Sequence, residues 1–155
     1  MTHSQDERDK DLLYPIKAPH KVKFSMHDEY ILACTNVDKQ LSIVDIRDSK
    51  PTTVTTSETS TAIAWSNDGS KLVVTGKEVV STFDVRNMEK PKKFSVGKET
   101  VGDIAFSVND DLFFMATVMG TVYVLAGDTL KPSNRGTFQA HTDFCTKITV
   151  DRTGK

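Results

Sequence analysis

The stretch Ile63-Ala64-Trp65-Ser66 decides the fold, because its order of aliphatic, small or polar, aromatic and serine residues recurs along the chain. Val22-Lys23-Phe24-Ser25 starts 41 residues before it, and Ile104-Ala105-Phe106-Ser107 starts 41 residues after it. A looser copy, Ile148-Thr149-Val150-Asp151, starts 44 residues further on. A fixed period of this length is the signature of repeat architectures. The chain is therefore predicted to consist of structural repeats.

The residues after each copy predict short β-strands. A polar turn comes first, at 26–29, 67–70, 108–111 and 152–155, and an apolar run follows at 30–33, 72–75 and 112–115. A second apolar run lies at 41–45, 79–84 and 121–125, and a more polar run at 52–55 and 92–96. Four such runs separated by turns predict a four-stranded antiparallel sheet. Because one small sheet cannot bury both faces, the sheets are expected to stack around an axis as a propeller.

The expected fold class is all-β, a partial β-propeller of about three four-stranded antiparallel blades plus the start of a fourth. The blades are predicted at 20–56, 61–96 and 101–139, with an incomplete one from about 145, in one domain over 19–155. Residues 1–18, which carry six charges between 6 and 11, are expected to be a flexible segment. Propellers of this kind usually close with about seven blades. The chain is therefore expected to be a fragment or a partial gene model, and to self-associate through exposed blade faces.

Composition narrows the function classes. The 155 residues include 20 basic and 21 acidic side chains, a net charge of -1, whereas proteins that hold nucleic acid alone usually show a basic excess. RNA is therefore expected to be at most an indirect partner. No apolar run reaches the roughly 18 residues of a membrane helix, and no signal peptide precedes the repeats, so a protein inside the cell and off the membrane is expected. Cys34 and Cys145, far apart in the sequence, do not make a secreted disulfide framework.

Several repeat positions resemble those of the WD40-repeat family. The turn Asn67-Asp68-Gly69 is similar to the inner turn of these repeats, and Val44-Asp45-Ile46-Arg47 and Phe83-Asp84-Val85-Arg86 resemble the Trp-Asp strand ending with the tryptophan replaced. Ala140-His141 resembles the Gly-His dipeptide, although earlier copies lack the histidine. The repeats are therefore degenerate. The resemblance assigns structural roles to Asp38, Asp45, Trp65, Asp68, Gly69, Asp84, Phe106 and His141.

Residues 60–155 resemble more closely the WD40 subunits of the THO complex, part of the TREX machinery that packages and exports mRNA. The similar stretches are Ala64-Trp65-Ser66-Asn67-Asp68-Gly69, Gly120-Thr121-Val122-Tyr123-Val124-Leu125 and Leu130-Lys131-Pro132. The resemblance implies a non-catalytic nuclear scaffold whose partners are protein subunits of THO/TREX. A WD40 adaptor of another assembly, in RNA processing, chromatin or ubiquitin-ligase recognition, is the alternative.

Few residues suggest chemistry. Cys145 and His141 could form a nucleophile and base, but no third group or oxyanion site accompanies them, so His141 is interpreted as a cap between blades. Asn109-Asp110-Asp111 could suggest calcium, but such a site needs about six or more oxygens, so solvated carboxylates are expected. There is no metal-ligand spacing and no phosphate-binding loop. We therefore expect no enzyme, metal, cofactor or small-molecule substrate.

Three further features are interpreted structurally. Trp65 and Cys34 are expected in the core. Lys90-Pro91-Lys92-Lys93 is a basic patch placed in the loop before an outer strand. It could contact phosphates, but a solvated edge that discourages strand pairing is the favoured interpretation.

Partner-binding residues are placed by topology alone. The loops that join blades, and the turns between second and third strands, are expected to open on one rim of the propeller. The alternative for these residues is ordinary turn polarity. The candidates are Lys39, Glu58, Lys77, Glu99, Met119 and Asp143.

Overall fold

The computed structural model describes residues 19–48 and 50–153, and these form three four-stranded antiparallel sheets. The first sheet contains β1 (Pro19–Phe24), β2 (Ile31–Asn36), β3 (Gln40–Asp45) and β4 (Thr52–Thr55). The second contains β5 (Ala62–Trp65), β6 (Lys71–Thr75), β7 (Val79–Asp84) and β8 (Asn87–Ser95). The third contains β9 (Val101–Phe106), β10 (Leu112–Thr117), β11 (Thr121–Ala126) and β12 (Pro132–Gln139). The all-β prediction is confirmed, whereas the expectation for residues 1–18 lies outside the described residues.

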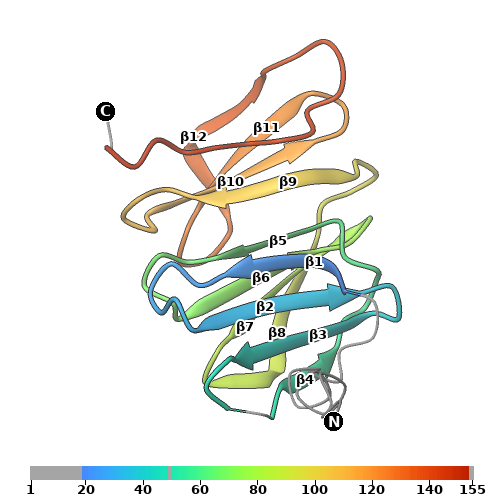
Figure 1. The fold of residues 1–155 in the computed structure, drawn as a ribbon. Coiled ribbons are helices and arrows are strands. Elements are labelled where there is room, and N and C mark those ends of the chain that lie inside the picture. Colours follow the sequence, from blue (N-terminus) through green and yellow to red (C-terminus); the bar gives the residue numbers. More distant parts are fainter. Residues whose placement is uncertain (1–18, 49, 154–155) are drawn as a thin grey trace, which may run out of the picture.

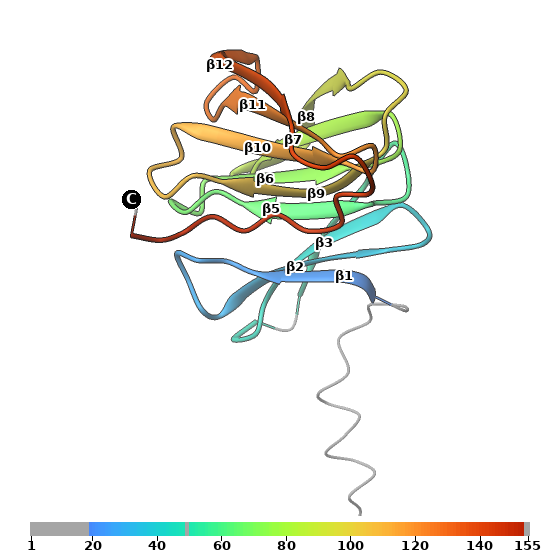
Figure 2. The same cartoon turned by 90° about the horizontal axis from the view of Figure 1, so that it is seen from above.

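Each sheet is a propeller blade whose strands follow one another in chain order (Figure 1). The first strands β1, β5 and β9 lie side by side, with β5 in contact with both neighbours. The other strands of each blade fan outward from them (Figure 2). Nothing in the described part of the chain forms a helix that could cross a membrane.

The core lies between neighbouring blades. Side chains of the middle blade alternate between its two faces, so they contribute to two separate core clusters. In β6, Leu72 and Val74 pack into the cluster shared with the first blade, whereas Val73 packs into the cluster shared with the third. Successive side chains of a strand point to opposite faces, so a blade with neighbours on both sides needs an unbroken apolar run. This explains why Leu72-Val73-Val74 does not alternate with polar residues.

The fourth strand is the most exposed one in the second and third blades, whereas in the first blade β1 is exposed along its whole length. β8 also corrects one expectation. The basic patch Lys90-Pro91-Lys92-Lys93 lies inside β8 and not in a loop before it. Pro91 can be accommodated because β8 pairs only with β7, and proline is restricted to edge strands.

The fourth copy of the repeat is docked but is not a strand. Cys145 is buried against Ala116 and Val122 of the third blade. The Ile148 backbone N–H donates to a carboxylate oxygen of Asp103 at 3.0 Å. Gly102 permits this approach, since a Cβ atom there would lie 2.6 Å from the Cys145 carbonyl oxygen. The segment therefore lies where a fourth first strand would lie (Figure 2), without a described strand to pair with it.

Candidate partner-binding rim

The blade-joining loops fold onto the turns between second and third strands, at the right-hand end of the molecule in Figure 1. We call this surface the joining-loop rim, defined by Lys39, Glu58, Lys77, Glu99, Met119 and Asp143. In the first blade, the Thr56 backbone N–H and hydroxyl both donate to the Lys39 carbonyl oxygen, at 2.7 and 3.0 Å. Lys39 has a φ of 61°, which a tight turn requires here.

Glu58 reaches from the first joining loop to the next blade. Its carboxylate accepts hydrogen bonds from the backbone N–H groups of Glu78 at 3.0 Å and Val79 at 3.3 Å. Gly76 leaves room for it, because a Cβ atom at that position would overlap the Glu58 side chain. The Glu58 carboxylate therefore caps a turn. The adjacent Lys77 is exposed.

Glu99, at the equivalent position one repeat later, has a different environment. One of its carboxylate oxygens is buried without a hydrogen-bond partner among the described residues. The pKa of the Tyr123 hydroxyl is raised, mainly by burial and to a smaller extent by the charge of Glu99. Equivalent acidic residues thus have different surroundings in successive blades.

The third blade adds exposed apolar surface to the joining-loop rim. Gln139 donates its side-chain amide to the Met119 carbonyl oxygen at 2.9 Å, while the Met119 side chain is 61% exposed. Asp143 accepts from the Phe144 backbone N–H at 2.8 Å, and Phe144 is 69% exposed. Together with exposed Val37, these side chains give the rim a mixture of apolar and charged groups.

The opposite end of the blades contains a contact that the sequence interpretation missed. Asp110 accepts hydrogen bonds from the Asn67 backbone N–H at 2.8 Å, the Asn67 side-chain amide at 2.7 Å and the Asp68 backbone N–H at 3.0 Å. The expectation of a merely solvated carboxylate was therefore wrong for Asp110. The reason is that a turn 43 residues earlier lies beside it in the propeller. A clue in the sequence was an aspartate where the preceding repeat has Gly69, since both adopt positive φ.

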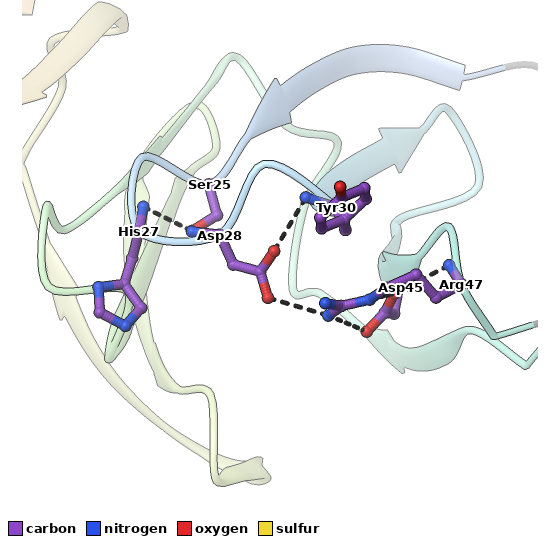
Figure 3. A network of polar contacts seen from close by, with 6 residues as sticks. All are labelled: Ser25, His27, Asp28, Tyr30, Asp45 and Arg47. Atoms are coloured by element: carbon purple, nitrogen blue, oxygen red, sulfur yellow. Dashed lines mark hydrogen bonds and ion pairs between the residues drawn. The ribbon is translucent and has the colours of Figure 1, made fainter.

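A surface ion-pair network holds the corresponding turn of the first blade (Figure 3). Arg47 pairs with Asp28 at 2.9 Å and with Asp45 at 2.7 Å, and its guanidinium lies 4.8 Å from the centre of the Tyr30 ring. The Arg47 side-chain hydrogen bond is the main reason that the pKa of Asp45 is lowered to about 2. The network joins the first turn of the blade to the end of its third strand.

The other repeat positions lie in the structural parts of the blades. Trp65 is 7% exposed and donates its indole N–H to the Lys23 carbonyl oxygen at 3.1 Å, which ties the first two blades together. Asp68 accepts from Ser66 and Ser70 within its own turn, and Asp84 accepts from the Arg86 backbone N–H. Phe106 packs edge-on against Phe113 in the core, and Asp38 lies exposed in the β2–β3 turn.

Cys145 and His141 are not assembled into a nucleophile and base. The buried Cys145 thiol lies 3.7 Å from the Lys147 carbonyl oxygen, whereas His141 is exposed and uses its backbone N–H to contact the Gly120 carbonyl oxygen. Cys34 is buried as expected, and burial raises its pKa. Within residues 19–48 and 50–153 no group of three or more histidine, cysteine or acidic side chains could hold a metal ion.

Comparisons with known proteins place the chain. No family model matches it. It is 32% identical over 127 residues to THO complex subunit 3 of Arabidopsis thaliana, which covers 81% of this chain and 39% of that protein. The solved structure of U3-55K, a WD40 propeller, superposes with a TM-score of 0.74 at 13% identity, covering 86% of this chain and 42% of the other. The chain thus spans less than half the length of either protein. Its described residues form three four-stranded blades of a WD40-type propeller, and its sequence resembles that of a THO complex subunit.

Proposed function

We propose that this chain acts as a non-catalytic scaffold that holds protein subunits of a THO/TREX-type assembly. The observation that carries the proposal is the 32% identity to THO complex subunit 3 over 81% of this chain. By the same similarity we infer a nuclear location and a role in mRNA processing and export, with RNA contacted through partners.

The joining-loop rim is the surface that we assign to partner binding. Glu58 directs its carboxylate to backbone N–H groups and Glu99 is partly buried, so both support the loops. Lys39, Lys77 and Met119 are the side chains that the turns present to solvent. A surface that mixes apolar and charged groups suits a protein interface, where an apolar centre is surrounded by a polar periphery.

The proposal of a scaffold without enzyme activity is supported by the separation of the chain's chemical groups. The Cys145 thiol is buried in an apolar cluster, and the exposed His141 side chain makes no hydrogen bond among the described residues. A nucleophile and its base must lie within hydrogen-bond distance to act together. Neither residue meets this requirement with the other.

The test is an affinity purification of the tagged chain from cells of its own organism, followed by mass spectrometry. We expect other THO subunits among the recovered proteins. The variant Lys39→Glu/Lys77→Glu/Met119→Ser should lose them, whereas the control Lys50→Glu/Arg135→Glu, which changes exposed residues outside the rim, should retain them. Recovery of a different assembly would favour the alternative of another WD40 adaptor. Loss in the control alone would place the interface elsewhere.

A further inference from the structure

The basic patch of β8 lies within a larger cationic hollow. Lys90 and Lys92 line a depression of about 220 Å³ together with Lys71 of β6 and Arg86 of the β7–β8 turn. Lys71 is separated from the other three in the sequence by β7, and the β-sheet brings it beside them. The sequence interpretation had considered only the four residues of the patch.

The strand register explains why these side chains share one face of the blade. Lys92 is paired with Thr82, and Lys71 is paired with Asp84. Directly opposed residues of an antiparallel pair project to the same side of the sheet. The next residue along this face of β6, Val73, packs against the third blade. The hollow therefore lies at the edge of the interface between the second and third blades, where Asp128 of the third blade completes its wall.

The positive charge of this hollow is incompletely compensated. Four cationic side chains face two carboxylates, those of Asp84 and Asp128, which leaves an excess of two positive charges. The ion pairs of the described residues all involve Arg47, so none of these four cations lies within 4.0 Å of a carboxylate oxygen in the described part of the chain. Arg86, Lys90 and Lys92 are exposed.

Polar donors are also in place. The Lys71 ammonium contacts the carbonyl oxygens of Gly127 at 3.3 Å and Asp128 at 3.4 Å, which holds the lysine across the interface. An ammonium has three N–H donors, so one remains for a ligand. The hydroxyls of Ser70 and Thr82 line the same hollow. A guanidinium, ammonium groups and hydroxyls are the groups that bind phosphoryl oxygens.

We propose that this hollow binds a phosphorylated serine or threonine in a segment of a partner protein. A phosphoserine carries a charge of about −1.5 to −2 at neutral pH, which matches the excess of two positive charges. Two features favour a single phosphoryl group over an RNA chain. Asp84 and Asp128 repel a continuous phosphodiester backbone, and no aromatic side chain lines the hollow to stack a base. This site is separate from the joining-loop rim and does not depend on the THO assignment.

The lysines of β8 also keep its free edge from pairing with other strands, and the two roles can be separated by face. Lys93 is paired with Ser81 and so projects to the opposite side from Lys92. A lysine that serves only edge protection should be equivalent at both positions. Phosphoryl binding requires Lys92 and not Lys93.

The experiment measures fluorescence anisotropy of a labelled Gly-Ser peptide that carries one phosphoserine, titrated with the 155-residue chain at low salt. We expect binding that depends on the phosphate and weakens by about tenfold or more in Lys90→Gln/Lys92→Gln, because two charge-assisted contacts are lost. The control Lys50→Gln/Lys93→Gln removes the same charge outside the hollow and should change affinity by less than about twofold. Circular dichroism of both variants verifies that they are folded.

Three results would overturn the proposal. One is equal binding of the unphosphorylated peptide, or no binding of either. Another is an equal loss in the Lys50→Gln/Lys93→Gln control, which would mean nonspecific charge attraction. The third is tighter binding of a ten-uridine RNA that falls with the Lys90→Gln/Lys92→Gln variant, which would assign the hollow to nucleic acid instead.

Discussion

Replacement of Asp110 by glycine separates two reasons for an aspartate at this position. Its φ of 61° is a conformation that glycine adopts without strain, and Gly69 occupies the equivalent place one repeat earlier. If only turn geometry mattered, glycine would be neutral or stabilising by up to about 1 kcal/mol. The carboxylate, however, accepts three hydrogen bonds from Asn67 and Asp68 of the neighbouring blade.

The magnitude follows from these contacts. A hydrogen bond to a charged group contributes about 1.5–3 kcal/mol when it is protected from water. Asp110 is only half-buried, so water can replace part of the lost bonding. We therefore expect Asp110→Gly to lower the free energy of unfolding by about 1–2 kcal/mol. Asp110→Ala should lower it by about 1 kcal/mol more, because alanine keeps the strained φ and makes none of the bonds.

Urea unfolding followed by the fluorescence of Trp65 measures these differences, since Trp65 is the single tryptophan and lies between two blades. A double-mutant cycle with Asn67→Ala isolates the interaction between Asn67 and Asp110. We expect a coupling energy of about 1 kcal/mol between Asn67 and Asp110, in the range seen for residues in contact. An Asp110→Gly protein as stable as the parent chain, with no coupling to Asn67, would mean that the Asp110 hydrogen bonds do not stabilise the contact between the two blades.

Three more predictions use the same unfolding assay or a size measurement. Trp65→Ala should cost about 3–5 kcal/mol, because it empties a buried site and leaves the Lys23 carbonyl without its indole partner; a loss below about 1 kcal/mol would mean that the ring is not core. The pKa of Asp45 is lowered from 3.8 to about 2, so its ionised form stabilises the fold above pH 4, and this contribution is lost as pH falls from 4 to 2. Asp45→Asn should therefore make the free energy of unfolding less dependent on pH between 4 and 2. An unchanged pH dependence would mean that the pair with Arg47 does not stabilise the fold. The 155-residue chain exposes large apolar side chains, among them Phe24, Phe138 and Phe144, and should therefore self-associate, which light scattering measures; a stable monomer at high concentration would contradict this.

The repeat period was enough to predict the blades, because each strand and its turns are determined by residues close together in the sequence. Leu72-Val73-Val74 and Leu112-Phe113-Phe114 are recognisable as strands from their own side chains and the turns before them. The register follows from the turns, since pairing within a blade joins segments only a few residues apart. Strand identity and order therefore needed no knowledge of the other blades.

Contacts between blades were the part that the sequence could not provide. Asp110 binds a turn 43 residues away, and Lys71 contacts carbonyl oxygens 56 and 57 residues away. The repeat period indicates that equivalent turns are neighbours, but which atoms bind depends on the rotation of one sheet relative to the next. The joining-loop rim was deduced from topology, but the capping role of Glu58 was not, because its carboxylate acts on the turn of the following blade.

The fourth copy of the repeat, at residues 145–150, also combines a part that its own sequence determines with a part that depends on a neighbouring strand. Its pattern predicted the first strand of a fourth blade, whereas Cys145 and Ile148 dock on the third blade without forming a strand. A strand, however, is defined by backbone hydrogen bonds to a neighbouring strand, and no described strand pairs with this segment. Its side chains specify the docking position and a second strand must supply the pairing. The sequence of each repeat therefore specifies where that repeat docks, whereas a segment becomes a β-strand only when another strand pairs with it.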